Sequence, residues 1–124
     1  MARILLVDDE QLLRETLKIA LQAAGHVVSL AQNGTAALAL LADQSFDVIV
    51  TDILMPETDG LEMIRRVRKE SGNVRIIAMS GGGRTRNMDM LDFATSFGAD
   101  AVLAKPFLPK QLIASVADIM GRSL

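Results

Sequence analysis

The chain of 124 residues lacks cysteine, and it has no strongly basic segment and no long apolar run. Without cysteine it can form neither a disulfide nor a thiolate metal site, which agrees with a cytosolic location. The net charge is −2 with both signs spread along the sequence, so nucleic-acid binding by bulk electrostatics is not expected. The N-terminal apolar run, residues 4–7, is too short for a secretory signal, and no run approaches the roughly 20 residues of a membrane span. We therefore expect a cytoplasmic, water-soluble protein that binds neither membranes nor nucleic acid directly.

The composition is that of one folded domain. Half of the residues are apolar, which is enough to build a core in a chain of this length. We find no linker, repeat or low-complexity segment. The last expected helix ends near Met120, so we expect a single domain over residues 1–124 with no output domain.

Short apolar runs alternate with longer amphipathic stretches. Several runs are apolar at consecutive positions, as in strands of a parallel sheet that is covered on both faces. The five expected strands are residues 4–7, 27–30, 48–50, 76–79 and 101–104.

The stretches between these runs have apolar residues at helical spacing. The expected faces are Leu13, Leu17, Ala20 and Ala24; Ala37, Leu38 and Leu41; Leu61, Ile64 and Val67; Leu91 and Ala94; and Leu112, Val116 and Ile119. Gly25 is expected to end the first helix, Asn33-Gly34 and Asp59-Gly60 to open the second and third, and Pro109 to lie in the first turn of the fifth. Five strand–helix units predict an open α/β sheet with helices on both faces and right-handed crossovers, but they do not give the strand order.

Charged or hydroxyl side chains follow four of the five expected strands, whereas the second is followed only by Ala31-Gln32-Asn33. In a parallel sheet, ligands gather beyond the carboxyl ends of the strands, so these residues are expected to meet on one rim. They are Asp8, Asp9 and Glu10 after the first strand, Asp52 at the end of the third, Ser80 at the end of the fourth and Lys105 after the fifth.

Three aspartates on one rim need positive charge beside them. Two carboxylates 4 Å apart repel by roughly 4 kcal/mol at an effective dielectric constant of about 20. Lys105 supplies one cation, and a hard divalent metal is the natural second because every available ligand is an oxygen. Mg²⁺ takes one or two carboxylates, keeps several waters and accepts a phosphate oxygen. The set therefore suits a site for a phosphoryl group.

Each of these residues also has an ordinary structural explanation. Asp8 or Glu10 alone could be a helix N-cap, Lys105 before a proline could be a surface loop residue, and Ser80 alone indicates little. The joint pattern is more specific, because each residue follows a different strand on the same rim.

The motifs in this order resemble those of bacterial two-component response-regulator receiver domains, of the kind found as single-domain chemotaxis receivers. They are Asp8-Asp9, the segment from Asp52 to Gly60, Ser80-Gly81 and Lys105-Pro106-Phe107, and together they span nearly the whole chain. The resemblance implies a flavodoxin-like fold with sheet order 2-1-3-4-5.

The resemblance also implies a role for each residue of the set. Asp52 would take the phosphoryl group from a phosphohistidine of a sensor histidine kinase or a histidine phosphotransfer protein. Asp9 would bind Mg²⁺ directly, Asp8 through water, and the carbonyl of Leu54 would be a further ligand. Lys105 would pair with the phosphoryl oxygens, from a cis peptide with Pro106, and Ser80 would donate a hydrogen bond to them.

Signal output would be a population shift of the surface formed by the fourth helix, fifth strand and fifth helix, read by a downstream protein. Loop 81–87, which holds three glycines, would move with Ser80. The domain would catalyse only its own phosphorylation and dephosphorylation, as a monomer or weak dimer. One position departs from the family pattern: Val102 stands where receivers commonly carry an aromatic residue. Leu54, which is apolar, is expected to slow loss of the phosphate.

Two other functions remain open. An aspartate-nucleophile phosphatase also uses Mg²⁺ and a lysine, but its nucleophile would follow the first strand, where this chain has Asp8-Asp9. A pseudo-receiver would bind partners without phosphate, and the intact set of acidic residues, Ser80 and Lys105 speaks against it. The only histidine, His26, is expected beside a turn on the opposite rim, without a role.

Overall fold

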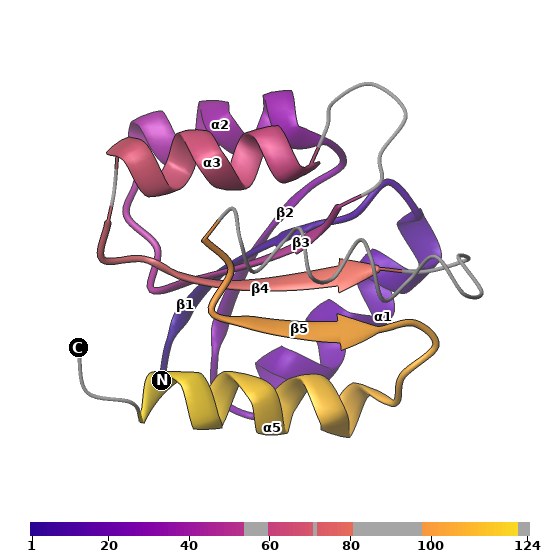
Figure 1. Ribbon diagram of the computed structural model, residues 1–124. Helices are drawn as coiled ribbons and strands as arrows, with labels where there is room; N and C mark the ends of the chain where they lie inside the picture. Colours follow the sequence, from indigo (N-terminus) through magenta and orange to yellow (C-terminus); the bar gives the residue numbers. More distant parts are fainter. Residues whose placement is uncertain (54–59, 71, 81–97, 122–124) are drawn as a thin grey trace.

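The structure is a computed structural model of the chain, and it describes residues 1–53, 60–70, 72–80 and 98–121. Five parallel strands form one sheet in the order β2-β1-β3-β4-β5 (Figure 1). The strands are β1 (Arg3–Val7), β2 (Val27–Ala31), β3 (Val48–Asp52), β4 (Arg75–Ser80) and β5 (Ala101–Ala104). This is the 2-1-3-4-5 order of the flavodoxin-like fold, as the resemblance implied.

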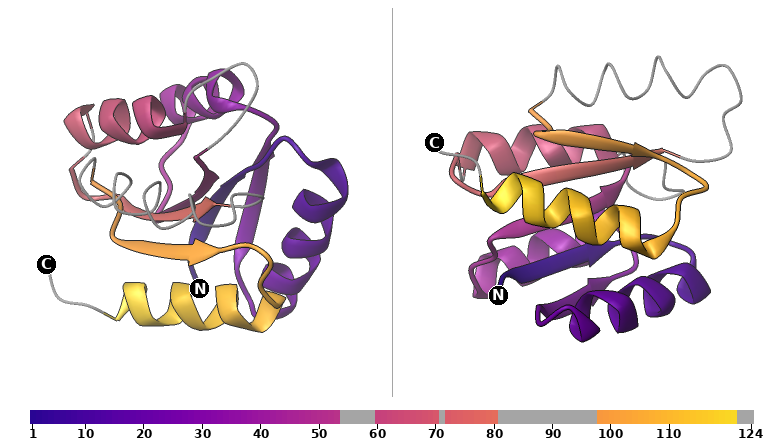
Figure 2. Two further views of the ribbon diagram at one scale, coloured as in Figure 1. Left: turned by 45° about the vertical axis from the view of Figure 1, so that its right-hand side comes forward. Right: turned by 90° about the horizontal axis from the view of Figure 1, so that it is seen from below.

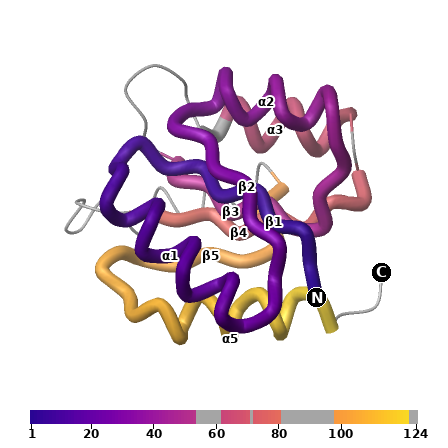
Figure 3. Tube along the Cα trace, turned by 180° about the vertical axis from the view of Figure 1, so that it is seen from behind, coloured from indigo at the N-terminus to yellow at the C-terminus, as the bar shows by residue number. Residues whose placement is uncertain are grey.

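Helices cover both faces of the sheet. They are α1 (Gln11–Ala23), α2 (Gly34–Asp43), α3 (Gly60–Glu70) and α5 (Pro109–Met120). Helices α1 and α5 contact each other on one face, and α2 and α3 lie side by side on the other (Figure 2). The view from behind shows the same three layers (Figure 3). The expected fourth helix falls outside the described residues.

The three central strands, β1, β3 and β4, are buried on both faces, which explains why they are apolar at consecutive positions. In β1, Leu5 and Val7 belong to the core under α2 and α3, whereas Ile4 and Leu6 belong to the core against α1 and α5. All four side chains are fully buried. Because successive side chains of a strand point to opposite faces, each run supplies both cores at once.

The helix ends are close to the expected positions. Gly25 follows α1 with a φ of +96°, a conformation that favours glycine, and Pro109 is the first residue of α5. The side chain of Asn33 caps α2 by accepting a hydrogen bond from the amide of Ala36 at 2.8 Å. The expectation for Ala24 was wrong: α1 has already ended at Ala23, and Leu21 is the residue that continues its buried face.

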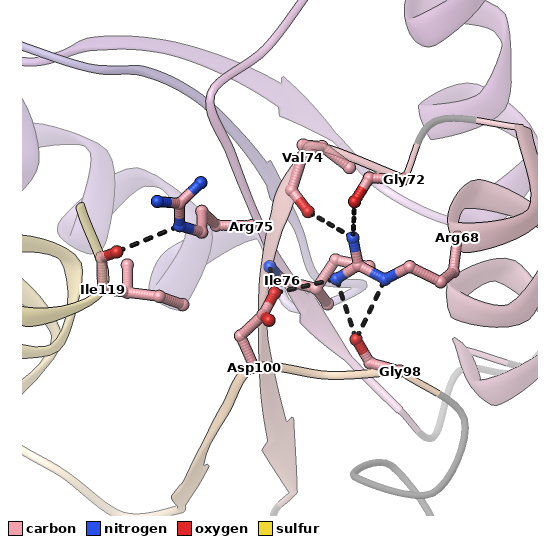
Figure 4. A network of polar contacts seen from close by, with 8 residues as sticks. All are labelled: Arg68, Gly72, Val74, Arg75, Ile76, Gly98, Asp100 and Ile119. Atoms are coloured by element: carbon pink, nitrogen blue, oxygen red, sulfur yellow. Dashed lines mark hydrogen bonds and ion pairs between the residues drawn. The ribbon is translucent and has the colours of Figure 1, made fainter. Parts of the chain in front are cut away.

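Arg68 at the end of α3 joins three segments at the amino ends of β4 and β5 (Figure 4). Its guanidinium donates to the carbonyls of Gly72 at 2.9 Å and Val74 at 2.6 Å. Two of its nitrogens also donate to the carbonyl of Gly98, at 3.2 and 2.8 Å. One side chain thus satisfies three backbone acceptors that no regular element pairs.

Asp100 completes this contact. Its Oδ2 accepts from Arg68 at 2.8 Å and from the backbone amide of Ile76 at 2.9 Å, which links the start of β5 to the start of β4 (Figure 4). Beside it, the Nε of Arg75 donates to the carbonyl of Ile119 at the end of α5. We call the group of Arg68, Asp100 and their three carbonyl partners the Arg68 cluster. It fixes the end of the sheet that lies away from the predicted site.

Among the helices that the structure describes, none is both long and apolar enough to cross a bilayer.

Candidate phosphoryl-acceptor site

The carboxyl ends of β1, β3 and β5 bring Asp8, Asp52 and Lys105 together, as the sequence predicted. The Nζ of Lys105 donates to Asp8 Oδ2 at 2.7 Å and to Asp52 Oδ2 at 3.0 Å. Asp8 is fully buried and Asp52 is 6% exposed, so both ion pairs lie largely out of water. The sequence separations of 97 and 53 residues show that the sheet topology, not local sequence, makes these contacts.

The third aspartate lies in the same place. Asp8, Asp9 and Asp52 each offer a carboxylate oxygen, and these three atoms lie within 4.8 Å of one another. Asp9 is exposed, whereas the other two carboxylates are buried. Three carboxylates with one lysine leave an excess of negative charge, which a bound cation would offset. Among the described residues, this group can hold a metal ion.

Ser80 lies at the end of β4, beside the lysine. The backbone amide of Lys105 donates to the carbonyl of Ser80 at 2.7 Å, and Ser80 is fully buried. The peptide bond between Lys105 and Pro106 is cis, as the resemblance implied. The structure therefore brings Asp8, Asp9, Asp52 and Lys105 together on this rim, and Ser80 borders them through the backbone of Lys105.

The local electrostatics keep the lysine charged. Burial alone would lower the pKa of Lys105, but its hydrogen bonds to Asp8 and Asp52 and the charges of these carboxylates outweigh burial and raise its pKa above the ordinary 10.5. Lys105 is therefore a permanent cation at neutral pH, able to face an anionic group.

The N-cap explanation for the acidic residues after β1 holds only in part. Glu10 is the N-cap of α1, but its side chain makes no capping bond. Asp8 Oδ1 accepts from the amide of Glu10 at 2.8 Å, while Oδ2 binds Lys105. One carboxylate of the site therefore also shapes the turn into α1.

Arg14, which was not predicted from the sequence as a site residue, lies against this turn. Its Nη1 donates to the backbone carbonyl of Asp8 at 2.7 Å. The sequence carries no signal for this contact, since an arginine next to Leu13 is ordinary in an amphipathic helix and its partner is a backbone carbonyl. Leu54 and loop 81–87, which were expected to take part in the site, lie outside the described residues.

Two further residues named from the sequence have defined places. Val102 is 37% exposed on β5, one of the two edge strands of the sheet. His26 lies just before β2, at the amino end of the sheet, and its Nδ1 accepts from the amide of Ala2 at 3.0 Å. It is on the opposite rim from Asp8 and Asp52, as expected.

Comparison with known proteins agrees with this fold. Residues 4–117 match the model of the response regulator receiver domain. The chain is similar to the response regulator MprA of Mycobacterium sp. (strain KMS), with 35% identity over 98% of this chain and 51% of that protein. It therefore spans about half the length of such curated relatives.

Solved structures give the same result. The chemotaxis protein CheY4 of Vibrio cholerae is similar with a TM-score of 0.87 and 31% identity, over 96% of this chain and 98% of that one. The response regulator TrrA of Thermotoga maritima, solved in complex with Mg²⁺ and BeF, is similar with a TM-score of 0.83 and 33% identity, over 96% and 99%. The chain belongs to the response regulator receiver domain family of two-component systems.

Proposed function

We propose that this receiver domain is a phosphorylation switch in which Asp52 accepts a phosphoryl group from a phosphohistidine. The observation that carries the proposal is the pair of contacts from Lys105 Nζ to Asp8 and Asp52, with Asp9 in the same group of carboxylates. The donor would be a sensor histidine kinase or a histidine phosphotransfer protein, as membership of two-component systems suggests.

The residues of the site fit Mg²⁺. Their ligand atoms are all carboxylate oxygens, a hard donor set, and their close spacing favours a small divalent ion. Asp9 and Asp52 would bind the ion directly and Asp8 through water; the carbonyl of Leu54, outside the described residues, would be a further ligand. When bound, Mg²⁺ neutralises carboxylate charge and so lets an anionic phosphoryl group approach.

In the transfer step, a carboxylate oxygen of Asp52 attacks the phosphorus atom. The new P–O bond forms as the P–N bond to the donor histidine breaks, and the departing imidazole nitrogen keeps the bonding electrons, with a proton taken from solvent where needed. Lys105, already charged and directed at Asp52, would pair with the phosphoryl oxygens, where charge is spread in the transition state.

After transfer, the new acyl phosphate offers acceptors beside the buried Ser80, whose hydroxyl would donate to them. Because Ser80 ends β4 and its carbonyl binds the amide of Lys105, a shift there would reach β5 directly. Output would be a population shift of the surface that includes β5 and α5, together with the fourth-helix segment outside the described residues. A downstream protein would read this surface.

The domain would act only on itself, phosphorylating and dephosphorylating Asp52, in the cytoplasm and as a monomer or weak dimer. Residues 1–124 would form one receiver unit. Since curated relatives are about twice as long, any output activity of the whole protein is a separate question.

The test is to incubate the protein with a small acyl-phosphate donor and Mg²⁺ and to measure its mass. We expect a gain of one phosphoryl group, lost in Asp52→Asn and kept in Asp43→Asn, which removes an exposed aspartate at the end of α2. Steady hydrolysis of the donor without a mass gain would instead indicate a phosphatase. No gain and no hydrolysis in the folded protein would indicate a pseudo-receiver.

A further inference from the structure

Arg14 holds the turn that carries two of the acidic residues. Its side chain donates from Nη1 to the carbonyl of Asp8, and its backbone amide donates to the carbonyl of Glu10 at 3.0 Å. Arg14 is half-buried in the second turn of α1. It therefore contacts the Asp8–Glu10 turn at both ends, with Asp9 between them.

The carbonyl of Asp8 belongs to the peptide unit that leads into Asp9. A peptide unit is planar, so a bond that fixes its oxygen also fixes the plane and the direction in which Asp9 leaves it. The other contacts of Asp8 do not do this: its amide binds Ala31 and its carboxylate binds Lys105 and the amide of Glu10. Among the described residues, Arg14 is the one that donates a hydrogen bond to the carbonyl of Asp8.

Asp9 depends on such support more than the other two carboxylates. Asp8 and Asp52 are buried and share Lys105, whereas Asp9 is exposed. Within the described residues, its carboxylate makes neither an ion pair nor a hydrogen bond. Its direction is therefore set by the backbone beneath it, which is the part that Arg14 holds.

We infer that Arg14 is a positioning residue of the cation site, which orients Asp9 toward Asp8 and Asp52 through the carbonyl of Asp8. This inference rests on the proposed Mg²⁺ site. Arg14 touches neither the metal nor the phosphoryl group; it acts by limiting the directions that Asp9 samples, so that less order has to be gained when the ion binds.

The charge of Arg14 and its hydrogen bond predict opposite effects on metal affinity. As a charge alone, a cation near three carboxylates competes with Mg²⁺, so its removal should tighten binding. As a positioning group, its removal should weaken binding. Arg14→Met keeps the unbranched stem while removing both charge and donors, so the sign of the change separates the two explanations.

The direct measurement is calorimetric titration with Mg²⁺ alone, without a phosphoryl donor. We expect Arg14→Met to weaken Mg²⁺ binding by about 10-fold, the lower end of the effect of removing an outer support of a metal ligand. Arg14→Lys, which keeps one donor that can reach the carbonyl, should recover part of the affinity. Lys18→Met is the matched control, since Lys18 is a half-buried cation one turn further along α1.

A second measurement follows labelling by an acyl phosphate against Mg²⁺ concentration. In Arg14→Met, the concentration for half-maximal rate should rise by about the same 10-fold, while the rate at saturating Mg²⁺ stays that of the wild type. A general loss of structure would lower both. If Arg14→Met does not fold, Arg14→Gln, whose amide is too short to span the same distance, replaces it with the same expectations.

Mg²⁺ binding by a folded Arg14 variant that equals or exceeds wild-type affinity would overturn the inference, as would a lower saturating rate at unchanged half-saturation. These outcomes are distinct from failure of the proposed function. A wild-type protein that binds Mg²⁺ but gains no phosphoryl group would overturn the phosphorylation proposal, while the effect of Arg14 on Mg²⁺ affinity would still be measurable.

Discussion

Two basic side chains join distant parts of this chain at opposite ends of the same sheet. At the carboxyl ends, Lys105 binds the carboxylates of Asp8 and Asp52, and a third carboxylate lies within 4.8 Å. At the amino ends, Arg68 binds one carboxylate and three backbone carbonyls. The first group keeps excess negative charge, whereas the second is balanced.

This difference distinguishes a binding site, at Lys105, from a purely structural contact, at Arg68. In the Arg68 cluster, the hydrogen-bond acceptors are satisfied within the protein, so these hydrogen bonds stabilise the folded state. The rim at Lys105 has three carboxylates but one lysine. The carboxylates therefore repel one another in the folded state, and a bound cation would relieve this repulsion. If this comparison is right, substitutions in the two regions should respond differently to Mg²⁺.

The largest expected effect is on stability, in Arg68→Met. The change removes the side-chain donor of three carbonyls and the cation paired with Asp100, and we expect the free energy of unfolding to fall by about 3 kcal/mol. Lys69→Met, which removes the neighbouring exposed cation on α3, should change it by less than about 0.5 kcal/mol. Urea unfolding with and without Mg²⁺ measures both. A loss that Mg²⁺ restores would contradict the separation of the two regions.

The next effect concerns Gly98, which lies against the same arginine. Its φ is +120°, and an added Cβ would lie 3.1 Å from Cγ of Arg68. We expect Gly98→Ala to lower the free energy of unfolding by about 2 kcal/mol through backbone strain and displacement of Arg68. Gly72→Ala is the matched control, because a Cβ there meets nothing within 4 Å. Equal losses in the two variants would show that the approach to Arg68 does not matter.

A smaller effect of opposite sign is expected at the rim. Asp9→Asn removes one of three crowded carboxylates without removing a partner of Lys105, so without metal it should stabilise the fold by about 1 kcal/mol at most. Thermal melts should then show that Mg²⁺ raises the melting temperature of the wild type but raises that of Asp9→Asn much less. Asp43→Asn, at the end of α2, should keep the wild-type response. An Asp9→Asn protein that gains as much from Mg²⁺ as the wild type would remove Asp9 from the site.

The smallest effect is the pH dependence at His26. Burial, and then the positive charge of the N-terminus, lower the pKa of His26 below 6.5, and its Nδ1 accepts from Ala2, so the folded state favours the neutral ring. The unfolded chain therefore binds the proton more readily. Stability from this residue is present above pH 6.5 and is lost as the pH falls through the lowered pKa.

The urea concentrations at the midpoint of unfolding, determined above and below pH 6.5, measure the contribution of His26 to stability. The wild type should lose slightly more stability on acidification than His26→Gln, which cannot titrate at that position. The same pH dependence in both proteins would refute the prediction.

Much of the site could be predicted from the sequence, because its residues follow strands. Runs of consecutive apolar residues predicted the strands. In a parallel sheet the carboxyl ends of the strands lie along one edge, so the polar residues that directly follow the strands are necessarily close to one another. The carboxylates of Asp8 and Asp52 meet Lys105 for this topological reason. Strand order came from the family resemblance, since runs of similar hydrophobicity do not encode which strands are neighbours.

The parts that sequence analysis missed are contacts from side chains to backbone carbonyls. Arg14 and Arg68 bind carbonyls whose positions depend on the turn geometry, and any residue type supplies a carbonyl, so the partner leaves no trace in the sequence. Ala24 was assigned to α1 because its spacing fits the apolar face. Gly25 turns the chain one residue later, and α1 has ended by then, so a local backbone conformation overrides the periodicity.

The central claim is that three carboxylates and one lysine, from four positions in the chain, form one cation-dependent phosphoryl site. The most direct test is a crystal structure of the domain with Mg²⁺ and beryllium fluoride. The account predicts one metal ion against Asp9 and Asp52, with the fluoride group on the carboxylate of Asp52 and within hydrogen-bonding distance of Lys105. A metal ion bound elsewhere, or a fluoride group that leaves Lys105 on Asp8 and Asp52 as before, would contradict it.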